Sequence, residues 1–403
     1  MTIANFKNKP KVSDLQADLN EAQPSHSKHK TDVKSWLNAL DIEGSSKIQV
    51  AKGRSSVQPK LIRKQAEWRY APLSEPFLST PDMFRVRPVT HGDLKAAHQN
   101  QALLNYQFST QINRTYFIDQ YVRTAVNTGS VVVRVGWERV EETVNETFHD
   151  IDLLDIESDE QMAILQSDVD MMERWPDEFS NLSDERKHAA RYAAETGKAT
   201  YGVVKRTYVK PVKRNKVNRP TLEVCDYRNI IIDPTCKGDI SKARFVIQAI
   251  DTSLAELKAT GIYSNLDKVE KGSVTSSLLD EGAKGNVYSE QFTFKDNARK
   301  RFTVHEYWGE WDIDGNGTTV PIVATWTGDT LIRLERNPFP DGRPPFVLVN
   351  YMPVLGEVYG EPDAELLNDN QRIAGAITRG MIDLLGRSAN AQMGVAKNML
   401  DLS

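Results

Sequence analysis

Cysteine is nearly absent from this 403-residue chain. Cys225 and Cys236 are the two cysteines. The sequence has no second pair of cysteines and no histidine next to either one, which argues against a zinc site. Two cysteines also argue against a disulfide framework, which fits a reducing cytosol. The length suffices for two or three domains with a sizeable core, so we expect packing to hold the fold together.

Long apolar runs and an excess of positive charge are absent as well. No window approaches 18 uninterrupted apolar residues, and the start, "MTIANFKNKPKVSDLQ", lacks the apolar region of a signal peptide. We therefore expect no membrane partner. The net charge of −4 argues against a protein that coats DNA by bulk charge. It is compatible with a protein that DNA passes through, because repulsion would then help.

Recognisable catalytic motifs are missing too. The sequence has neither G-x-S-x-G nor H-E-x-x-H, and "VAKGRSS" lacks the spacing of a phosphate-binding loop. His305 and Glu306 are neighbours on an expected strand, so they point to opposite faces. We expect no enzymatic activity and no cofactor.

One short segment resembles half of a calcium site. "DIDGNG" places Asp312 and Asp314 as in an EF-hand loop, but Val323 stands where a bidentate glutamate is needed. A hairpin turn between two strands explains the segment without a metal, and that is the prediction. A metal-dependent enzyme acting on nucleic acid remains the alternative.

The first part of the chain is predicted to be largely helical after an arm. Residues 1–52 are polar and lysine-rich, and they predict an extended arm with one short helix near Asp32–Ala39. A helix from Gln58 to about Tyr70 should stop at the prolines of "YAPLSEP". Alternating residues predict a strand over Phe84–Val89. Asp93–Val126 predicts one long helix or, equally, two helices with a bend near Asn113.

The middle of the chain alternates between strands and an insertion. "SVVVRVGWERV" predicts a strand. Residues 141–198 predict a helical insertion between two strands of one sheet, because two segments begin with a capping serine and acidic residues. The acidic residues 141–160 are typical of a solvated face or of a surface for a basic partner. "KPVKRNKVNR" is typical of a solvated hairpin tip or, alternatively, of a phosphate contact.

After residue 262 we expect a surface loop to about residue 300, and then a meander of three strands over 301–335. The order of helices and strands predicts an α+β fold. A long helix from Asp363 to about Asn390 ends the pattern, and its roughly 30 residues would reach ~45 Å.

This last helix has a narrow apolar stripe between polar faces. Such a stripe fits a helix that packs beside similar helices in a ring, whereas an ordinary amphipathic helix of a longer domain is the alternative. Glycines at 375, 380 and 386 cost helix stability, and close approach of neighbouring helices would explain them. The stripe also includes Leu385, and the predicted stem-packing residues are Leu366, Ile373, Ile377, Met381 and Leu384.

Several segments together resemble the portal proteins of tailed bacteriophages, the head-to-tail connectors, and most of all the large portals of podoviruses and related myoviruses. The segments are "WRYAPLSEPF", "RNIIIDPTCKGDISKARFVIQ", "HEYWGEWDIDGNG" and, above all, "NPFPDGRPPF" followed by "YG" and the long polar helix. The likeness runs from about Ala51 to the end, and it does not include the 1–52 arm or the 141–198 insertion.

This resemblance implies a homo-oligomeric ring, usually a dodecamer, at one vertex of the capsid. It implies a wing domain over 53–360 with mixed sheet and helices, a first stem helix over 361–395 and the start of the clip at 396–403. Because portals continue beyond the clip, we expect this chain to be the N-terminal part of a longer one. The implied partners are double-stranded DNA, terminase, a head–tail adaptor, and capsid and scaffold proteins.

The implied function is a channel for genome packaging and ejection, located in the virion and assembled in the host cytoplasm. If the stem lines the channel, Arg372 and Arg379 lie on one face and are candidates for DNA contact. The alternative is that they pair with Asp369, Asp383 or the next subunit. A different virion component, such as an adaptor, is a further alternative that the strand meander argues against.

Overall fold

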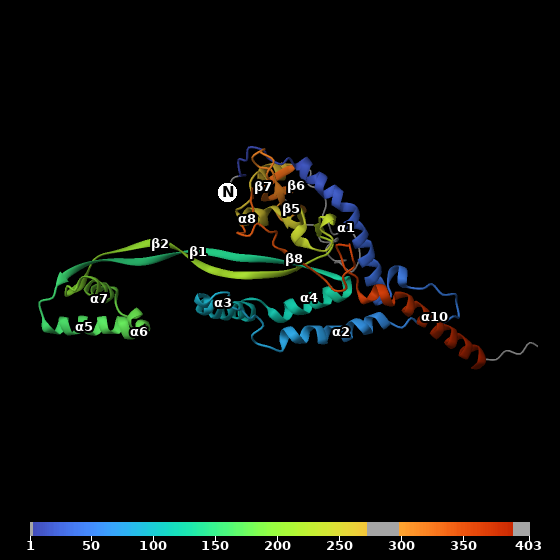
Figure 1. Cartoon of the computed structure of the whole chain (residues 1–403), viewed down its shortest axis with the longest axis horizontal. Coiled ribbons are helices and arrows are strands. Elements are labelled where there is room, and N and C mark those ends of the chain that lie inside the picture. The colour runs from blue at the N-terminus through green and yellow to red at the C-terminus, as the bar shows by residue number, and fades with distance from the viewer. Residues whose placement is uncertain (1–2, 272–297, 390–403) are drawn as a thin grey trace, which may run out of the picture. The chain divides into compact units, whose positions relative to one another are not determined.

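The computed structural model describes residues 3–271 and 298–389, and it divides into two compact units (Figure 1). One unit comprises the residues up to Gly136 and those from Pro220 onward, and the other is Trp137–Arg219. Both contain helices and antiparallel strands. The predicted α+β class is therefore confirmed.

Helix α1 (Val12–Asp41) replaces most of the predicted extended arm, so that prediction was wrong. Its apolar residues are sparse among many polar ones, which hides the pattern in the sequence. Leu15 and Ala22 nevertheless pack on the larger sheet, and Trp36 and Leu40 pack among helices. Burial along its whole length stabilises a helix that its composition alone would not.

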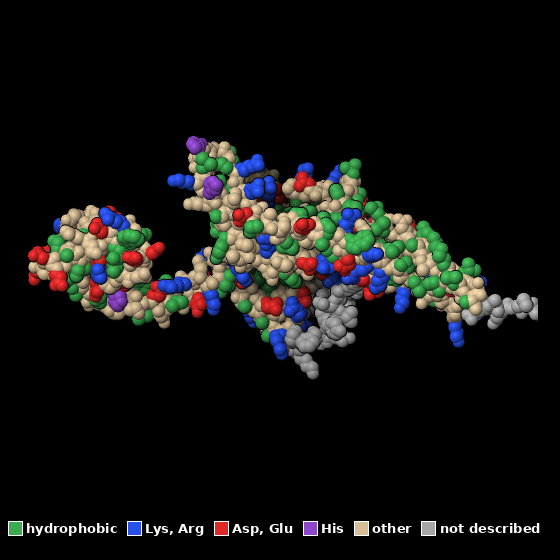
Figure 2. Space-filling view, turned by 90° about the horizontal axis from the view of Figure 1, so that it is seen from below, with side chains coloured by type: hydrophobic (Ala, Val, Ile, Leu, Met, Phe, Trp, Pro, Cys, Tyr) green, Lys and Arg blue, Asp and Glu red, His purple; other side chains and the backbone are tan. Residues whose placement is uncertain are grey.

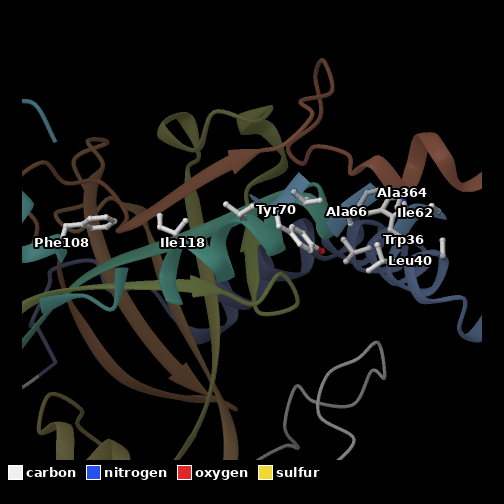
Figure 3. Close-up of a cluster of buried hydrophobic side chains, with 12 residues drawn as sticks. Trp36, Leu40, Ile62, Ala66, Tyr70, Phe108, Ile118 and Ala364 are labelled. Atoms are coloured by element: carbon white, nitrogen blue, oxygen red, sulfur yellow. The ribbon is translucent and has the colours of Figure 1, made fainter. Parts of the chain in front are cut away.

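Trp36 and Leu40 of α1 pack in a layer that is formed by three further helices. These helices are α2 (Leu61–Leu78), α3 (Leu94–Tyr106) and α4 (Arg114–Thr128). Ile62, Ala66 and Tyr70 of α2 meet Phe108, Ile118 and Ala364 in one hydrophobic cluster (Figure 3). A π-helical turn, Gln107–Gln111, separates α3 from α4, and the Asn113 side chain caps α4. The bend near Asn113 is thus confirmed.

Two predictions in this layer were wrong. Helix α2 continues through Pro72 and Pro76 to Leu78. The carbonyl that Pro72 leaves without a partner belongs to Trp68, which is 64% exposed, so water can bind it. Phe84–Val89 is not a strand, because the side-chain amide of Asn105 hydrogen-bonds both the N–H and the C=O of Phe84, at 2.9 and 3.0 Å.

A five-stranded antiparallel sheet forms the second layer of this unit, in the order β3-β4-β5-β6-β7. The three-strand meander is confirmed as β5, β6 and β7. Part of the predicted loop 262–300 is instead helix α9, while 272–297 lie outside the described residues. The elements are β3 (Ile230–Ile232), β4 (Phe245–Ser253), α8 (Leu254–Thr260), α9 (Leu266–Lys271), β5 (Arg301–Trp311), β6 (Val320–Thr327) and β7 (Thr330–Arg336).

The "DIDGNG" segment is the predicted turn between β5 and β6. The Asp312 carboxylate accepts hydrogen bonds from the backbone N–H groups of Gly315, Asn316 and Gly317. These bonds lower the pKa of Asp312, with the Gly317 N–H as the largest cause. The carboxylate is therefore used in shaping the hairpin.

A separate sheet has the order β2-β1-β8, formed by β1 (Ser130–Asp155), β2 (Thr200–Cys225) and β8 (Phe346–Asn350). Because β1 and β2 are neighbours, the segment between them is an insertion within one sheet, as predicted. Its helices are α5 (Asp159–Arg174), α6 (Pro176–Ser180) and α7 (Asp184–Thr196). Leu165, Phe179 and Ala190 form the core of this second unit.

The predicted start of the insertion at residue 141 and the predicted hairpin tip were wrong, because both charged runs belong to strands. The acidic run is largely exposed, as expected for a solvated face. Residues 141–155 continue β1, and "KPVKRNKVNR" is part of β2 rather than a hairpin tip. The two strands are cross-linked by ion pairs, and opposite charges across strands stabilise their pairing. The pairs are Arg219–Glu138 at 2.9 Å, Lys213–Glu141 at 3.6 Å, Lys216–Glu142 at 3.5 Å and Lys205–Asp152 at 2.9 Å.

Candidate functional site

Helix α10 (Asp363–Ala389) confirms the predicted long final helix over the described residues. Its first turn is held by three contacts. The Arg69 guanidinium pairs with Asp363 at 3.2 Å, Tyr351 hydroxyl donates to the same carboxylate, and the Trp36 indole N–H donates to Glu365 at 2.5 Å. Acidic side chains at this end also suit the positive end of the helix dipole.

Gln371 joins three helices through one side-chain amide. Its Nε2 donates to the Ala39 carbonyl at 2.8 Å, and its Oε1 accepts from the Ile62 N–H at 2.9 Å. Ala39 lies in the last turn of α1 and Ile62 in the first turn of α2, where backbone groups lack partners within their own helix. Gln371 therefore caps two helix ends from the buried face of α10.

Further along the same side, α10 contacts the segment that precedes α2. Gly375 is buried, and a Cβ there would lie 3.6 Å from the Pro59 Cδ and 3.1 Å from the Arg379 guanidinium. The Asp383 carboxylate accepts from the Ser55 N–H at 2.8 Å and pairs with Arg54 at 3.4 Å. The glycine at 375 thus meets a close neighbour within the chain itself.

The opposite side of α10 has no partner among the described residues. The predicted stripe residues point there, and their exposed fractions lie between 54% and 69%. Figure 2 shows hydrophobic side chains gathered along this helix. The structure therefore brings the predicted residues together on one exposed face: Leu366, Ile373, Ile377, Met381 and Leu384, with Leu385 beside them.

Arg372 and Arg379 line a cavity of about 560 Å³ together with Gln371 and Gly375 of the side that faces the body of the chain. The cavity also borders on Ser35, Ser46 and Gln58 of the neighbouring segments. Arg372 lies 4.0 Å from Asp369, which is a weak pair at the surface, and the Arg379 guanidinium donates to the Val57 carbonyl at 3.3 Å. Asp383 pairs with Arg54 instead of either arginine.

Sequence reasoning placed the stripe but missed the contacts that orient it. Gln371 and Asp383 lie on what the sequence shows as polar faces. In the structure Gln371 is buried, and the Asp383 carboxylate binds Ser55 and Arg54. The only signal for Gln371 was its position opposite the stripe, five residues after Leu366. Its partners are more than 300 residues away in sequence, so no local pattern names them.

Within residues 3–271 and 298–389 no cluster of three or more histidine, cysteine or acidic side chains has the geometry to hold a metal ion. Among the helices of those same segments, none combines the length and the apolar character needed to cross a membrane.

The exposed stripe, the long helix and the α+β body agree with a comparison against protein-family models. The model described as "Phage SU10 portal protein" matches residues 12–403, which is nearly the whole chain. The match includes α1 and the helical insertion, neither of which was part of the likeness in the sequence. The chain therefore belongs to the phage SU10 portal protein family.

Proposed function

We propose that this chain assembles into a closed ring at a single vertex of the phage capsid, and that the genome enters and leaves through the ring. Portal proteins are structural components of the virion, so a phage portal role follows from the family. The ring, its copy number, the DNA channel, and the docking of terminase, adaptor and scaffold proteins go beyond that. Assembly would take place in the host cytoplasm.

The observation that carries the proposal is the two-sidedness of α10. Gln371 and Gly375 fix one side to the body of the chain, while Ile377 and its neighbours remain bare on the other. Isolated exposed apolar residues are common, but five in one continuous helical stripe favour an interface. A stripe that meets a different surface on the next copy gives head-to-tail contacts, which can close into a ring.

Ile377→Asp tests the stripe. Ile377 is 54% exposed, so an aspartate there should barely change the free energy of unfolding, yet it would place a charge inside the proposed interface. Leu103→Asp on α3 is a matched control, because Leu103 is 53% exposed on another helix. Mass photometry and negative-stain electron microscopy should show rings for the wild type and the control, and smaller species for Ile377→Asp.

Wild-type protein that stayed monomeric at micromolar concentration would contradict the ring. Rings that persisted in Ile377→Asp would contradict the role of the stripe but not the ring itself. The two failures are therefore separable.

DNA contact by Arg372 and Arg379 is a finer part of the proposal. What supports it is that both guanidiniums lie on one side of α10 and that Arg372 is 76% exposed. The alternative was that both arginines form ion pairs, and only the Arg372 contact with Asp369 is of that kind, because Arg379 donates to the Val57 carbonyl. Arg372→Gln combined with Arg379→Gln should slow DNA packaging while rings still form, and unchanged packaging would remove the contact from the proposal.

A further inference from the structure

The outer face of α2 carries two lysines and an exposed aromatic ring. The same face holds Glu67, which pairs with Arg63 and Arg123, and the exposed Glu75 further along the helix. Lys60, Lys64 and Trp68 follow one another at helical spacing, on the side opposite the buried Ile62 and Ala66. Both lysines are exposed, and neither makes an ion pair in the described part of the chain. Lys64 lies over the Trp68 ring, with its ammonium 4.9 Å from the ring centre.

A complementary surface exists on the same polypeptide. The helices of the second unit carry ten acidic and four basic residues, and Arg174 is the single base of α5. Trp175 and Ile164, which are 60% and 45% exposed, supply apolar area beside the charge. The exposed acidic residues of α5 and α6 without an ion pair in the described part are Asp159, Glu160, Asp170, Glu173, Asp177 and Glu178.

The acidic residues on the outer side of α5 are not part of the core of the second unit. Leu165 and Asp168 point inward, where Asp168 forms a bidentate ion pair with Arg186 at 2.5 and 2.8 Å. Because inward and outward residues alternate at helical spacing, Asp170 and Glu173 remain on the surface of α5. The acidic groups on this surface are therefore available to a basic partner.

We infer that the acidic face of α5 and α6 in one copy docks on the Lys60–Lys64–Trp68 face of α2 in a neighbouring copy. This inference rests on the proposed ring, because it needs adjacent copies. The two faces are different patches, so their contact is head-to-tail, as a ring requires. Opposite charge would set the register of the contact and aromatic area would add burial. A salt dependence follows, since screening shortens the reach of the charges.

Zero-length cross-linking with a carbodiimide tests the contact directly, because it joins lysine amines to carboxylates that touch. Rings would be assembled from an equimolar mixture of ¹⁵N-labelled and unlabelled chains. Peptides containing Lys60 or Lys64 should be joined to peptides containing Asp170 or Glu173, and half of the products should combine one labelled and one unlabelled peptide. Products joined only within single chains, or none in intact rings, would overturn the docking while leaving the ring standing.

Charge exchange supplies the second test. Lys60→Glu with Lys64→Glu, or Asp170→Lys with Glu173→Lys, should each raise the subunit concentration for half assembly by about fivefold, as expected for a few surface ion pairs. The four changes together should return it to within about twofold of the wild type. Arg87→Glu with Lys95→Glu is the control, because it removes the same charge from exposed positions elsewhere. If the combined variant is not rescued, the docking is wrong.

Discussion

The Arg134 guanidinium and the Glu306 carboxylate meet at 2.8 Å and join the two sheets of the larger unit. Arg134 belongs to β1 and Glu306 to β5, and the Glu306 side chain is only 2% exposed. The same Oε1 also accepts from the Trp308 indole N–H at 2.6 Å, and the Arg333 guanidinium lies 3.9 Å from Oε2. Removing only one of the two charges of such a buried ion pair is costly, because the remaining charge is left without its partner.

Glu306→Gln should lower the free energy of unfolding by about 3 kcal/mol, because it leaves the Arg134 charge without its buried partner. Chemical denaturation followed by circular dichroism would measure the change. Glu310→Gln, on the exposed end of the same strand, should cost under about 0.5 kcal/mol. Equal losses in the two variants would show that the ion pair is not what stabilises the junction.

Gln371→Met should lower the free energy of unfolding by about 2–4 kcal/mol. Methionine has a similar volume, but it leaves the Ala39 carbonyl and the Ile62 N–H buried and unsatisfied. Asn370→Met is the matched control at an exposed neighbour and should be nearly neutral. Hydrogen exchange should also show faster exchange at the start of α2 in Gln371→Met alone, and unchanged exchange there would argue against the double cap.

Gly129→Ala tests a close approach between the end of α4 and the segment that leads into α10. Gly129 has φ +78°, and an added Cβ would lie 2.5 Å from the Gly360 carbonyl oxygen. The left-handed conformation and the displaced backbone should together cost about 3 kcal/mol or more. Gly356→Ala, with φ +84° and open space around it, should cost only ~1 kcal/mol. Similar melting temperatures in both variants would contradict the close approach.

The buried His29 should make stability depend on pH. Burial, reinforced by the nearby His26, lowers the pKa of His29 to about 3, and its ring stacks on Tyr359 with centres 3.7 Å apart. The unfolded chain binds a proton at about pH 6.5 and the folded chain does not. Stability is therefore highest above that pH and falls by about 1.4 kcal/mol per pH unit between pH 6.5 and 3.

His29→Phe keeps the stacked ring and should make that slope shallower in denaturation curves recorded from pH 7 to pH 4. Some slope should persist, because burial also lowers the pKa of His305 to about 4. His98→Phe changes an exposed ring and should retain the wild-type slope. A slope in His29→Phe as steep as in the wild type would exclude His29 as its source.

The elements that could be predicted from sequence were those whose pattern is local and strong. The meander after residue 301 and the final helix have regular apolar spacing bounded by turn residues. The bend near Asn113 was one of two alternatives that the apolar pattern left open, and the structure selects it. The stripe on α10 was found for the same reason, since its residues lie within one helix.

What could not be predicted depends on partners distant in the sequence. Helix α1 forms because Leu15 and Trp36 reach two different cores, although its composition is that of an arm. Phe84 lies outside any strand because the Asn105 side chain binds its backbone. The basic run is part of β2 because acidic residues about 70 positions earlier or more lie opposite it. In each case a tertiary contact overrides a local preference.

The two sides of α10 also separate two kinds of genetic damage. A change at Gln371 should reduce the amount of folded chain and would be detected by any assay of solubility or expression. If the stripe joins neighbouring copies as proposed, a change at Ile377 should leave expression and solubility unaltered and still prevent the formation of infectious particles. A mutational scan that scores only protein abundance would therefore classify the stripe as tolerant, whereas a scan that scores plaques would classify it as essential.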